Sequence, residues 1–106
     1  MHVVILVTAG SAKEAQRIAA NLIKNKLAAC VNIISGIQSV FWWKGKVDKA
    51  SEALLMIKSK RSLLPKIIKA VRAVHSYEVP EIIALPIVGG ERKYLRWIDD
   101  SIGKSR

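Results

Sequence analysis

The sequence has few residues of the kinds that cross-link a fold or anchor it in a membrane. Its one cysteine, Cys30, excludes an intrachain disulfide and a cysteine-rich zinc site. Because Cys30 follows the apolar Leu27-Ala28-Ala29, we expect a buried, inert thiol. The apolar run Val3–Val7 is too short to span a bilayer and lacks the preceding basic stretch of a signal peptide. We therefore expect a protein of a reducing compartment, the cytoplasm, with no membrane partner.

Motifs of the common enzyme classes are also missing. Thr8-Ala9-Gly10-Ser11 follows the first apolar run, has a single glycine and matches neither nucleotide-binding pattern. It contains no arginine, which a small acylphosphatase-like hydrolase would need in a phosphate loop there. No Gly-x-Ser-x-Gly motif is present, and the spacing of Cys30, His75 and Asp99 does not favour a catalytic triad. The sequence therefore does not predict an enzyme.

Acidic residues are scarce relative to basic ones. The chain has 18 Lys and Arg against 8 Asp and Glu, a formal net charge of +10. Such a charge permits nucleic acids, anionic membranes or anionic metabolites as partners. The basic residues are spread over the whole length, however, and only Lys58-Ser59-Lys60-Arg61 is locally dense. A solvated basic surface is the plainer interpretation.

Hydrophobic periodicity predicts four strands and three helices. The strands are short runs rich in β-branched residues, and the helices have apolar residues at helical spacing. Ser11 and Glu14 fit a capping box, and Ser62 is expected to cap the second helix with Pro65 in its first turn. Ser35-Gly36 is the expected site of a bulge. The predicted strands are 2–7, 31–41, 52–58 and 82–88, the predicted helices are 11–26, 62–74 and 91–102, and 42–51 is a hairpin connection.

The predicted elements follow in the order β-α-β-β-α-β-α. Without the last helix, this is the ferredoxin-like order βαββαβ. We therefore predict an α+β fold, ferredoxin-like with an extra C-terminal helix, in a single domain covering residues 1–106. Right-handed crossovers place both crossover helices on the same face of the sheet. The last four residues are expected to fray.

Every predicted strand is apolar on both faces. In the third strand, residues 54 and 56 point one way and residues 53, 55 and 57 the other, and all five are hydrophobic. Two helices cover one face, and the short last helix covers only part of the other. Trp42 and Trp43 also point to opposite faces, so at most one enters the chain's own core. We expect a neighbouring copy of the chain to cover the remaining apolar surface.

The segment His75-Ser76-Tyr77-Glu78-Val79-Pro80-Glu81 brings an imidazole, a phenol and two carboxylates together. His75 is either a plain helix-end histidine, favoured there by the helix dipole, or a metal ligand or polar anchor. Transition-metal sites take three or four ligands, so partners would have to come from Tyr77, Glu78 or a neighbouring subunit. Each candidate also has a structural interpretation, such as a buried tyrosine ring or a surface ion pair. The candidate ligand-site residues besides His75 are Tyr77, Glu78, Glu81 and Lys58.

Three segments together resemble the divalent cation tolerance family, CutA. They are Lys26–Asn32, then Ser39–Gly45 followed by Glu52, and His75–Ile82 with Tyr94–Trp97. The resemblance covers nearly the whole chain with its spacings intact. It implies a ferredoxin-like subunit and a tight homotrimer whose sheets pack together, similar to the P-II signalling proteins. It also implies a non-enzymatic role in the tolerance of, or response to, copper and other divalent metals, with binding of the metal or of a small ligand.

The same resemblance identifies where copper ligands have been proposed in the family. They are a cysteine at the end of the first strand and a histidine pair before the tyrosine, positions held here by Val7, Val74 and His75. Ser76 also stands where the family usually has proline. His75 is thus the one metal ligand that remains, and we expect weak binding of copper(II) or another divalent cation.

A single-stranded RNA-binding module on a ferredoxin-like sheet is the alternative function. Such a module stacks bases on exposed aromatics of its central strands, within a basic-Gly-aromatic pattern. The chain has one Phe and no such run. We therefore expect no specific nucleic-acid partner.

Overall fold

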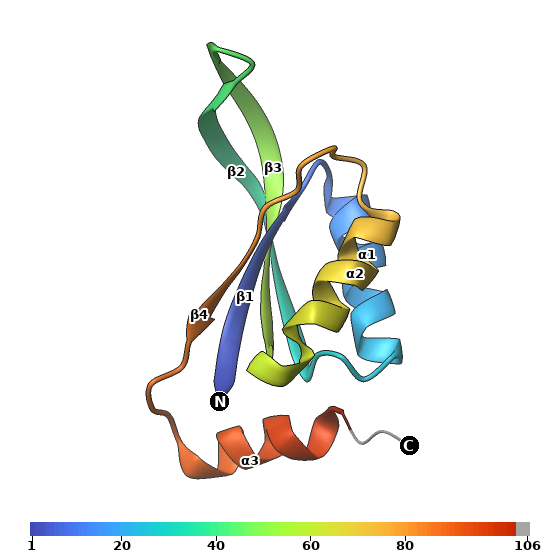
Figure 1. Cartoon of the computed structure of the whole chain (residues 1–106), viewed down its shortest axis with the longest axis vertical. Coiled ribbons are helices and arrows are strands. Elements are labelled where there is room, and N and C mark those ends of the chain that lie inside the picture. The colour runs from blue at the N-terminus through green and yellow to red at the C-terminus, as the bar shows by residue number, and fades with distance from the viewer. Residues whose placement is uncertain (104–106) are drawn as a thin grey trace.

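The computed structural model describes residues 1–103 and contains one sheet, two helices packed on it and a third helix at its end (Figure 1). The order β-α-β-β-α-β-α confirms the predicted α+β, ferredoxin-like fold with an extra C-terminal helix. Most of the predicted fraying concerns residues 104–106, which lie outside the described residues. The elements are β1 (His2–Ala9), α1 (Ala12–Lys24), β2 (Cys30–Trp43), β3 (Lys46–Lys60), a 3-10 turn (Arg61–Leu63), α2 (Leu64–Val74), β4 (Ile82–Pro86) and α3 (Arg92–Ser101).

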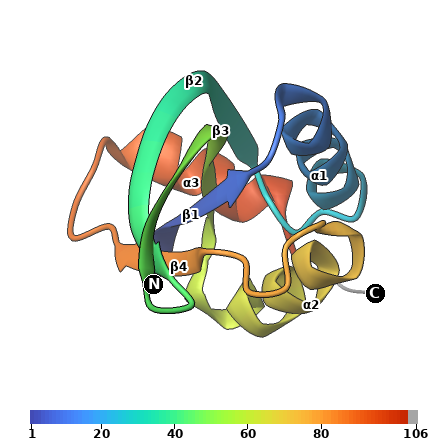
Figure 2. The same ribbon diagram turned by 90° about the horizontal axis from the view of Figure 1, so that it is seen from above.

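The four strands form one antiparallel sheet in the order β2-β3-β1-β4. β1 is central, pairing with β3 from His2 opposite Lys60 and with β4 from Val3 opposite Pro86. β2 and β4 are therefore the two edges. Both crossover helices, α1 and α2, lie on the same face of the sheet, as predicted (Figure 2).

The core lies between this face and the two helices. Odd-numbered residues of β1 and β3 point into it, whereas even-numbered residues such as Leu54 and Met56 stay partly exposed on the other face. This alternation confirms the expected two apolar faces. Each large aliphatic side chain that is fully buried here contributes about 1.5–3 kcal/mol. The completely buried large residues of this core are Ile5, Val7, Leu55 and Ile57 of the sheet, and Ile18, Leu22, Ile67 and Val71 of the helices.

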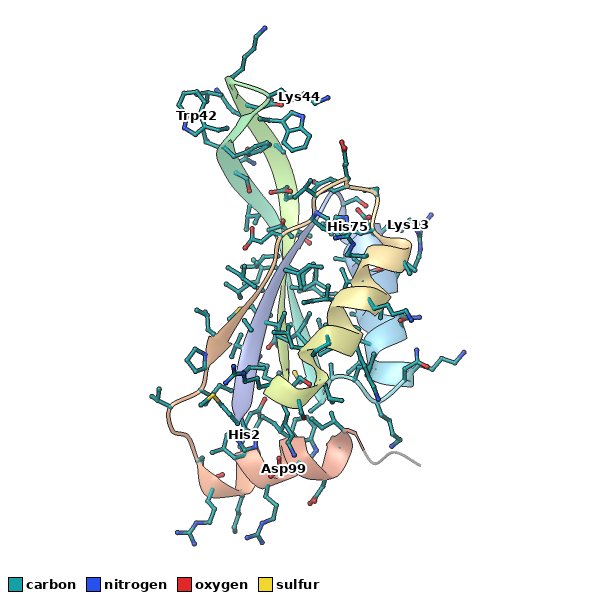
Figure 3. The ribbon with its side chains drawn as sticks, in the orientation of Figure 1. His2, Lys13, Trp42, Lys44, His75 and Asp99 are labelled. Atoms are coloured by element: carbon teal, nitrogen blue, oxygen red, sulfur yellow. The ribbon has the colours of Figure 1, made fainter. Side chains whose placement is uncertain are left out.

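The largest departure from the prediction is the segment 42–51. It was expected to be a hairpin connection, but β2 and β3 continue as a long arm joined by Lys44-Gly45 alone (Figure 3). Both turn residues have positive φ, 52° and 78°, the conformation of a tight two-residue hairpin turn. The prediction was wrong because this arm extends beyond the helices, so its strands need no regular apolar pattern. The predicted bulge is confirmed between Ile34 and Ile37.

Two smaller predictions were also wrong. β4 ends at Pro86 instead of Val88 because Pro86 already faces Val3, near the start of the central strand, and its nitrogen cannot donate to a ladder. Val88 is 99% exposed. Ser62 does not cap α2; it lies in the 3-10 turn, and Leu63 holds the cap position without a side-chain hydrogen bond. Proline does stand in the first turn of α2, as predicted.

Helix α3 crosses the end of the sheet opposite the hairpin tip (Figure 1). Glu91 caps it by accepting a 2.8 Å hydrogen bond from the Tyr94 N–H. Its residue Ile98 is buried, and Oδ1 of its Asp99 lies 2.9 Å from Nε2 of His2 (Figure 3). Within residues 1–103, no helix has both the length and the apolar character needed to cross a membrane.

Candidate functional site

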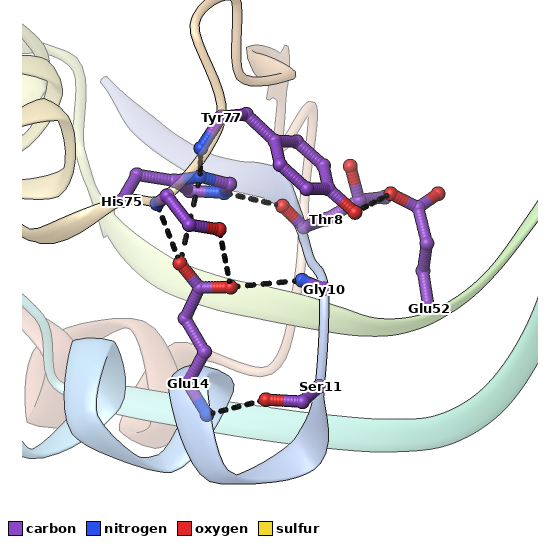
Figure 4. Close-up of polar contacts among 8 residues, drawn as sticks. Thr8, Gly10, Ser11, Glu14, Glu52, His75 and Tyr77 are labelled. Carbon is purple, nitrogen blue, oxygen red and sulfur yellow. Dashed lines mark hydrogen bonds and ion pairs between the residues drawn. The ribbon is translucent and has the colours of Figure 1, made fainter.

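A connected group of polar side chains lies where β1 runs into α1 and the chain leaves α2 (Figure 4). Gly10, Ser11 and Glu14 come from the β1–α1 turn and the first turn of α1, and Glu52 comes from β3. The segment 75–77 follows α2 and bonds to Glu14 and Glu52. The fold thus brings the predicted His75 and Tyr77 together with two carboxylates from distant parts of the sequence.

His75 is completely enclosed in this group, with a side-chain exposure of 0%. Its Nε2 lies 2.7 Å from the Thr8 carbonyl oxygen, which can only accept, so Nε2 carries the hydrogen. Its Nδ1 accepts a 3.0 Å hydrogen bond from the Tyr77 N–H. Both ring nitrogens are therefore occupied within the protein. A metal ion would have to displace one of these partners. This geometry therefore favours the polar-anchor interpretation of His75 over the copper(II)-ligand interpretation.

Glu14 joins the two ends of the site. Its carboxylate accepts hydrogen bonds from the Gly10 N–H at 2.9 Å, the Ser76 N–H at 2.7 Å and the Ser76 hydroxyl at 3.1 Å. Burial alone would raise the pKa of this carboxyl, but the Ser76 and Gly10 hydrogen bonds and the nearby His75 ring outweigh it, so the pKa is lowered. Glu14 is thus held as an anion.

The predicted capping box is only half present. Ser11 Oγ accepts a 3.1 Å hydrogen bond from the Glu14 N–H, as expected. The Glu14 side chain does not bond to Ser11 in return, because its oxygens are taken by Gly10 and Ser76. Gly10 eases this approach, because a Cβ there would stand in tight contact, 3.3 Å from Glu14 Oε1 and 3.4 Å from the Tyr77 ring.

Tyr77 connects the site to β3. Its hydroxyl donates a 2.7 Å hydrogen bond to Glu52 Oε2, and its ring packs against the His75 ring at a centroid distance of 4.7 Å. Burial, the hydrogen bond to Glu52 and the negative charges of Glu52 and Glu14 raise the pKa of Tyr77 to about 12. The phenol therefore keeps its proton and acts as a donor to Glu52 at neutral pH.

Beside Tyr77 lies a groove of about 760 Å³ between the hairpin arm and the segment 77–81. The predicted candidates Glu78 and Glu81 are exposed and line it, together with Glu52 and Asp48. The aromatic side chains of the arm form another part of its wall. They are Phe41, Trp42 and Trp43.

The structure does not bring Lys58 to this site. Lys58 lies six residues along β3 from Glu52, about 20 Å at the rise of a strand. Its ammonium group bonds to the Asn32 side chain on the sheet face away from α1 and α2. Cys30 stands opposite Lys58 on the same face and is partly exposed, so the expectation of a buried thiol was wrong. Among residues 1–103, no three His, Cys, Asp or Glu side chains form a group that could hold a metal ion.

The family model described as "CutA1 divalent ion tolerance protein" matches residues 3–101 of the chain. The chain belongs to this family. The chloroplastic Protein CutA 1 of Oryza sativa subsp. japonica is 50% identical over 103 residues, which is 97% of this chain and 58% of that protein. The divalent-cation tolerance protein CutA of Thermus thermophilus is 44% identical over 103 residues, covering 97% of this chain and 100% of that protein.

A solved CutA structure has nearly the same fold as this chain. The divalent cation tolerance protein (Cut A1) from Thermus thermophilus superposes with a TM-score of 0.95 at 44% identity, covering 97% of this chain and 100% of that one. These similarities confirm the resemblance seen in the sequence. The chain spans just over half the length of the rice CutA protein.

Sequence reasoning missed two residues of the site in this CutA chain. Glu14 was interpreted as half of a capping box, and Glu52 only as the residue that follows the aromatic segment. The signal for Glu14 is its place in the first turn of a helix that begins after Gly10-Ser11. No local signal links Glu52 to Tyr77, because that contact joins residues 25 positions apart.

Proposed function

We propose that this CutA chain acts as a homotrimer in the tolerance of, or response to, divalent cations. Copper(II) or another divalent cation would bind weakly, and the protein would carry no catalytic activity. The observation that carries the proposal is the sheet face opposite α1 and α2, which a single chain leaves largely uncovered.

This open face is apolar at its centre and toward the β4 edge. Ile83 and Leu85 of β4 are 50% and 49% exposed, and Ile34 of β2, at the opposite edge of the sheet, is exposed as well. Val4, Leu6, Leu54 and Met56 are only partly covered on the same face. Helix α3 lies at one end of the sheet and leaves this surface uncovered (Figure 1). A continuous apolar surface of this kind is typical of a protein–protein interface.

The two free edges of the sheet support a ring of copies over a two-fold dimer. β2 and β4 lie at opposite edges, so pairing β2 of one copy with β4 of the next is a head-to-tail contact. Such contacts close into a ring when the rotation between copies fits. The hairpin arm would reach the neighbouring copy, which agrees with Trp42 being 75% exposed on one side of the arm. Val40 and Val47 on that same side are exposed as well.

Weak cation binding and a non-enzymatic role are supported by the chemistry of the site. A single chain gathers no metal-binding group within residues 1–103, so ligands would have to come from more than one subunit or be few. The buried His75 bonds through both ring nitrogens and so lacks a free nitrogen to act as a general base. The open face is aliphatic at its centre, which favours the trimer over the RNA-binding alternative. The cytoplasm remains the compartment that we propose.

Size-exclusion chromatography with light scattering at micromolar concentration tests the assembly. We expect a particle of three times the 11.7 kDa chain mass. Ile83→Asp, on the open face, should produce monomers, whereas Val88→Asp is the matched control because Val88 is fully exposed off the sheet. A wild-type peak at the mass of one chain would refute the trimer.

Native mass spectrometry of the same protein with and without copper(II) tests the metal. It counts chains and bound ions in one measurement, so a failure of metal binding is distinguished from a failure of assembly. We expect copper on the trimer that is lost on mild dilution, as weak binding requires. Absence of copper and of other divalent cations at millimolar concentration would contradict the proposed cation binding.

A further inference from the structure

The groove beneath the hairpin arm has a charge opposite to that of the rest of the protein. The chain carries a net charge of +10 and has 8 acidic residues in all. Four of these eight, Asp48, Glu52, Glu78 and Glu81, line this one groove, and Lys49 is the single basic residue of its lining within residues 1–103. A negatively charged hollow in a basic protein attracts cations and excludes the anions that the remaining surface attracts.

Glu52 is the most informative of these carboxylates. It is only 8% exposed, and one of its oxygens accepts from the Tyr77 hydroxyl. Among residues 1–103, no cation lies within ion-pair distance of it and no second hydrogen bond reaches it. Because no enclosed polar atom lacks a partner in this part of the chain, the second oxygen must open toward the groove. An anionic oxygen that is held in place and open to the groove is a contact point for a cation.

The aromatic wall adds a second attraction for cations. Phe41 and Trp43 lie on the same side of the arm as Asp48, since Phe41 pairs with Asp48 in the β2–β3 register. The Lys44 ammonium already lies 5.8 Å from the centroid of the Trp43 ring (Figure 3 labels Lys44). This contact is the geometry of a cation–π interaction. The wall is therefore suited to ammonium groups next to an aliphatic chain.

The carboxylates are spread along the groove, and this spacing selects the occupant. Asp48 and Glu52 are four residues apart on β3, about 13 Å along a strand, while Glu78 and Glu81 belong to the opposite wall. No three acidic, His or Cys side chains in residues 1–103 converge on a point where one metal ion could sit. Separated carboxylates fit several positive charges carried on one flexible chain.

We propose that this groove binds a small aliphatic polyamine, with one ammonium group at Glu52 and others at the carboxylates of the rim. The methylene segments between the ammonium groups would lie against Phe41 and Trp43. The volume of about 760 Å³ is ample for such a ligand and lies in the usual range of small-molecule sites. Tyr77 holds Glu52 in place by donating its hydroxyl hydrogen.

This inference does not rest on metal tolerance, but the groove adjoins the proposed trimer contact. Val40 and Trp42, which we assign to a subunit contact, also line this groove, and Glu52 lies on the same side of β3 as Leu54 and Met56 of the open face. A neighbouring copy would therefore border the groove, and the polyamine would bind beside it. If a basic side chain of a second copy filled the groove instead, the trimer would stand and the polyamine would not bind.

Titration calorimetry of the intact protein with spermidine tests the proposal, at low salt and again at about 0.15 M, where exposed charges are largely screened. We expect one spermidine per chain with a dissociation constant below about 1 mM at the higher salt. Glu52→Gln should weaken binding about tenfold, the effect of one charge-assisted contact. This variant keeps an amide oxygen for the Tyr77 hydroxyl. Glu81→Gln, at an exposed position, should weaken binding without any risk to folding.

Asp100→Asn is the matched control, because it removes the same charge from the exposed surface of α3, at the other end of the sheet. It should leave spermidine binding within twofold of wild type. Equal weakening in all three variants would mean non-specific charge attraction and would overturn the proposal. So would the absence of binding by the wild type, or binding of a lysine-rich peptide but not of spermidine.

Discussion

Replacing Glu14 with glutamine is the sharpest test of how the site is held together. In the wild type, one carboxylate oxygen accepts from the Gly10 N–H and the Ser76 hydroxyl, and the other accepts from the Ser76 N–H. Glutamine can keep the first oxygen, but its amide nitrogen would then face the Ser76 N–H, donor against donor. The variant therefore loses one charge-assisted hydrogen bond and gains a repulsive contact.

The expected cost of Glu14→Gln is about 2–3 kcal/mol in the free energy of unfolding, from the range for buried hydrogen bonds to a charged group. For a chain of this length, that lowers the midpoint of thermal unfolding by roughly 10 °C. Urea unfolding followed by circular dichroism measures it, with all proteins at one concentration because assembly contributes to stability. Asp100→Asn, an exposed carboxylate of α3, should change stability by less than about 0.5 kcal/mol.

The lowered pKa of Glu14 adds a pH dependence with a definite sign. The folded protein holds this carboxyl below its ordinary value of 4.5, so the ionised group stabilises the fold fully above pH 4.5. That contribution is lost as the pH falls through the folded pKa. The difference in stability between wild type and Glu14→Gln should thus be constant near neutral pH and shrink below 4.5. A variant as stable as wild type at pH 7, or a difference that persists in acid, would refute this account.

Three further predictions concern Tyr77, His75 and nucleic acids. Tyr77→Phe leaves the nearly buried Glu52 without its donor and should lower the free energy of unfolding in urea by about 1–3 kcal/mol; unchanged stability would contradict the contact. The wild-type Tyr77 phenol should titrate near pH 12 in ultraviolet absorbance. His75→Ala removes an enclosed ring with two hydrogen bonds and should cost about 2–3 kcal/mol. Copper(II) affinity, measured by calorimetry, should stay unchanged in this variant, whereas a clear loss would identify the ring as the ligand that the sequence suggested. RNA binding, measured by fluorescence anisotropy, should collapse between roughly 50 and 200 mM salt; sequence-selective binding that survives would favour the RNA-binding alternative.

Local patterns predicted the fold well where strands and helices share a core. The alternation of residues 53–57 and the spacing of Ile18 and Leu22 report burial directly, and burial here follows the pattern. The hairpin arm was missed because residues 42–51 pack on no helix of their own chain, so their sequence carries no burial signal. Val88 was wrongly assigned to the fourth strand because it is β-branched. The pairing of β4 with β1 already ends at Pro86.

The candidate site was predictable only in its contiguous part. The segment 75–81 stands out by composition, and the structure places its Tyr77, Glu78 and Glu81 together at the groove. What His75 does could not be read from sequence, because its role depends on a backbone carbonyl at Thr8, which no side-chain pattern encodes. Lys58 was grouped with the site by charge density alone, and strand geometry separates them.

The central position of β1 has a consequence for how the protein is made. β1 is synthesised before both strands that it pairs with, residues 53–60 and 82–86. An apolar strand must therefore wait through the synthesis of most of the chain, covered on one side by α1 alone. The local β2–β3 hairpin can form earlier, because its strands are joined by two residues. Completion of the sheet thus depends on residues close to the C-terminal helix, and a nascent chain halted before β4 would present β1 with one edge unpaired.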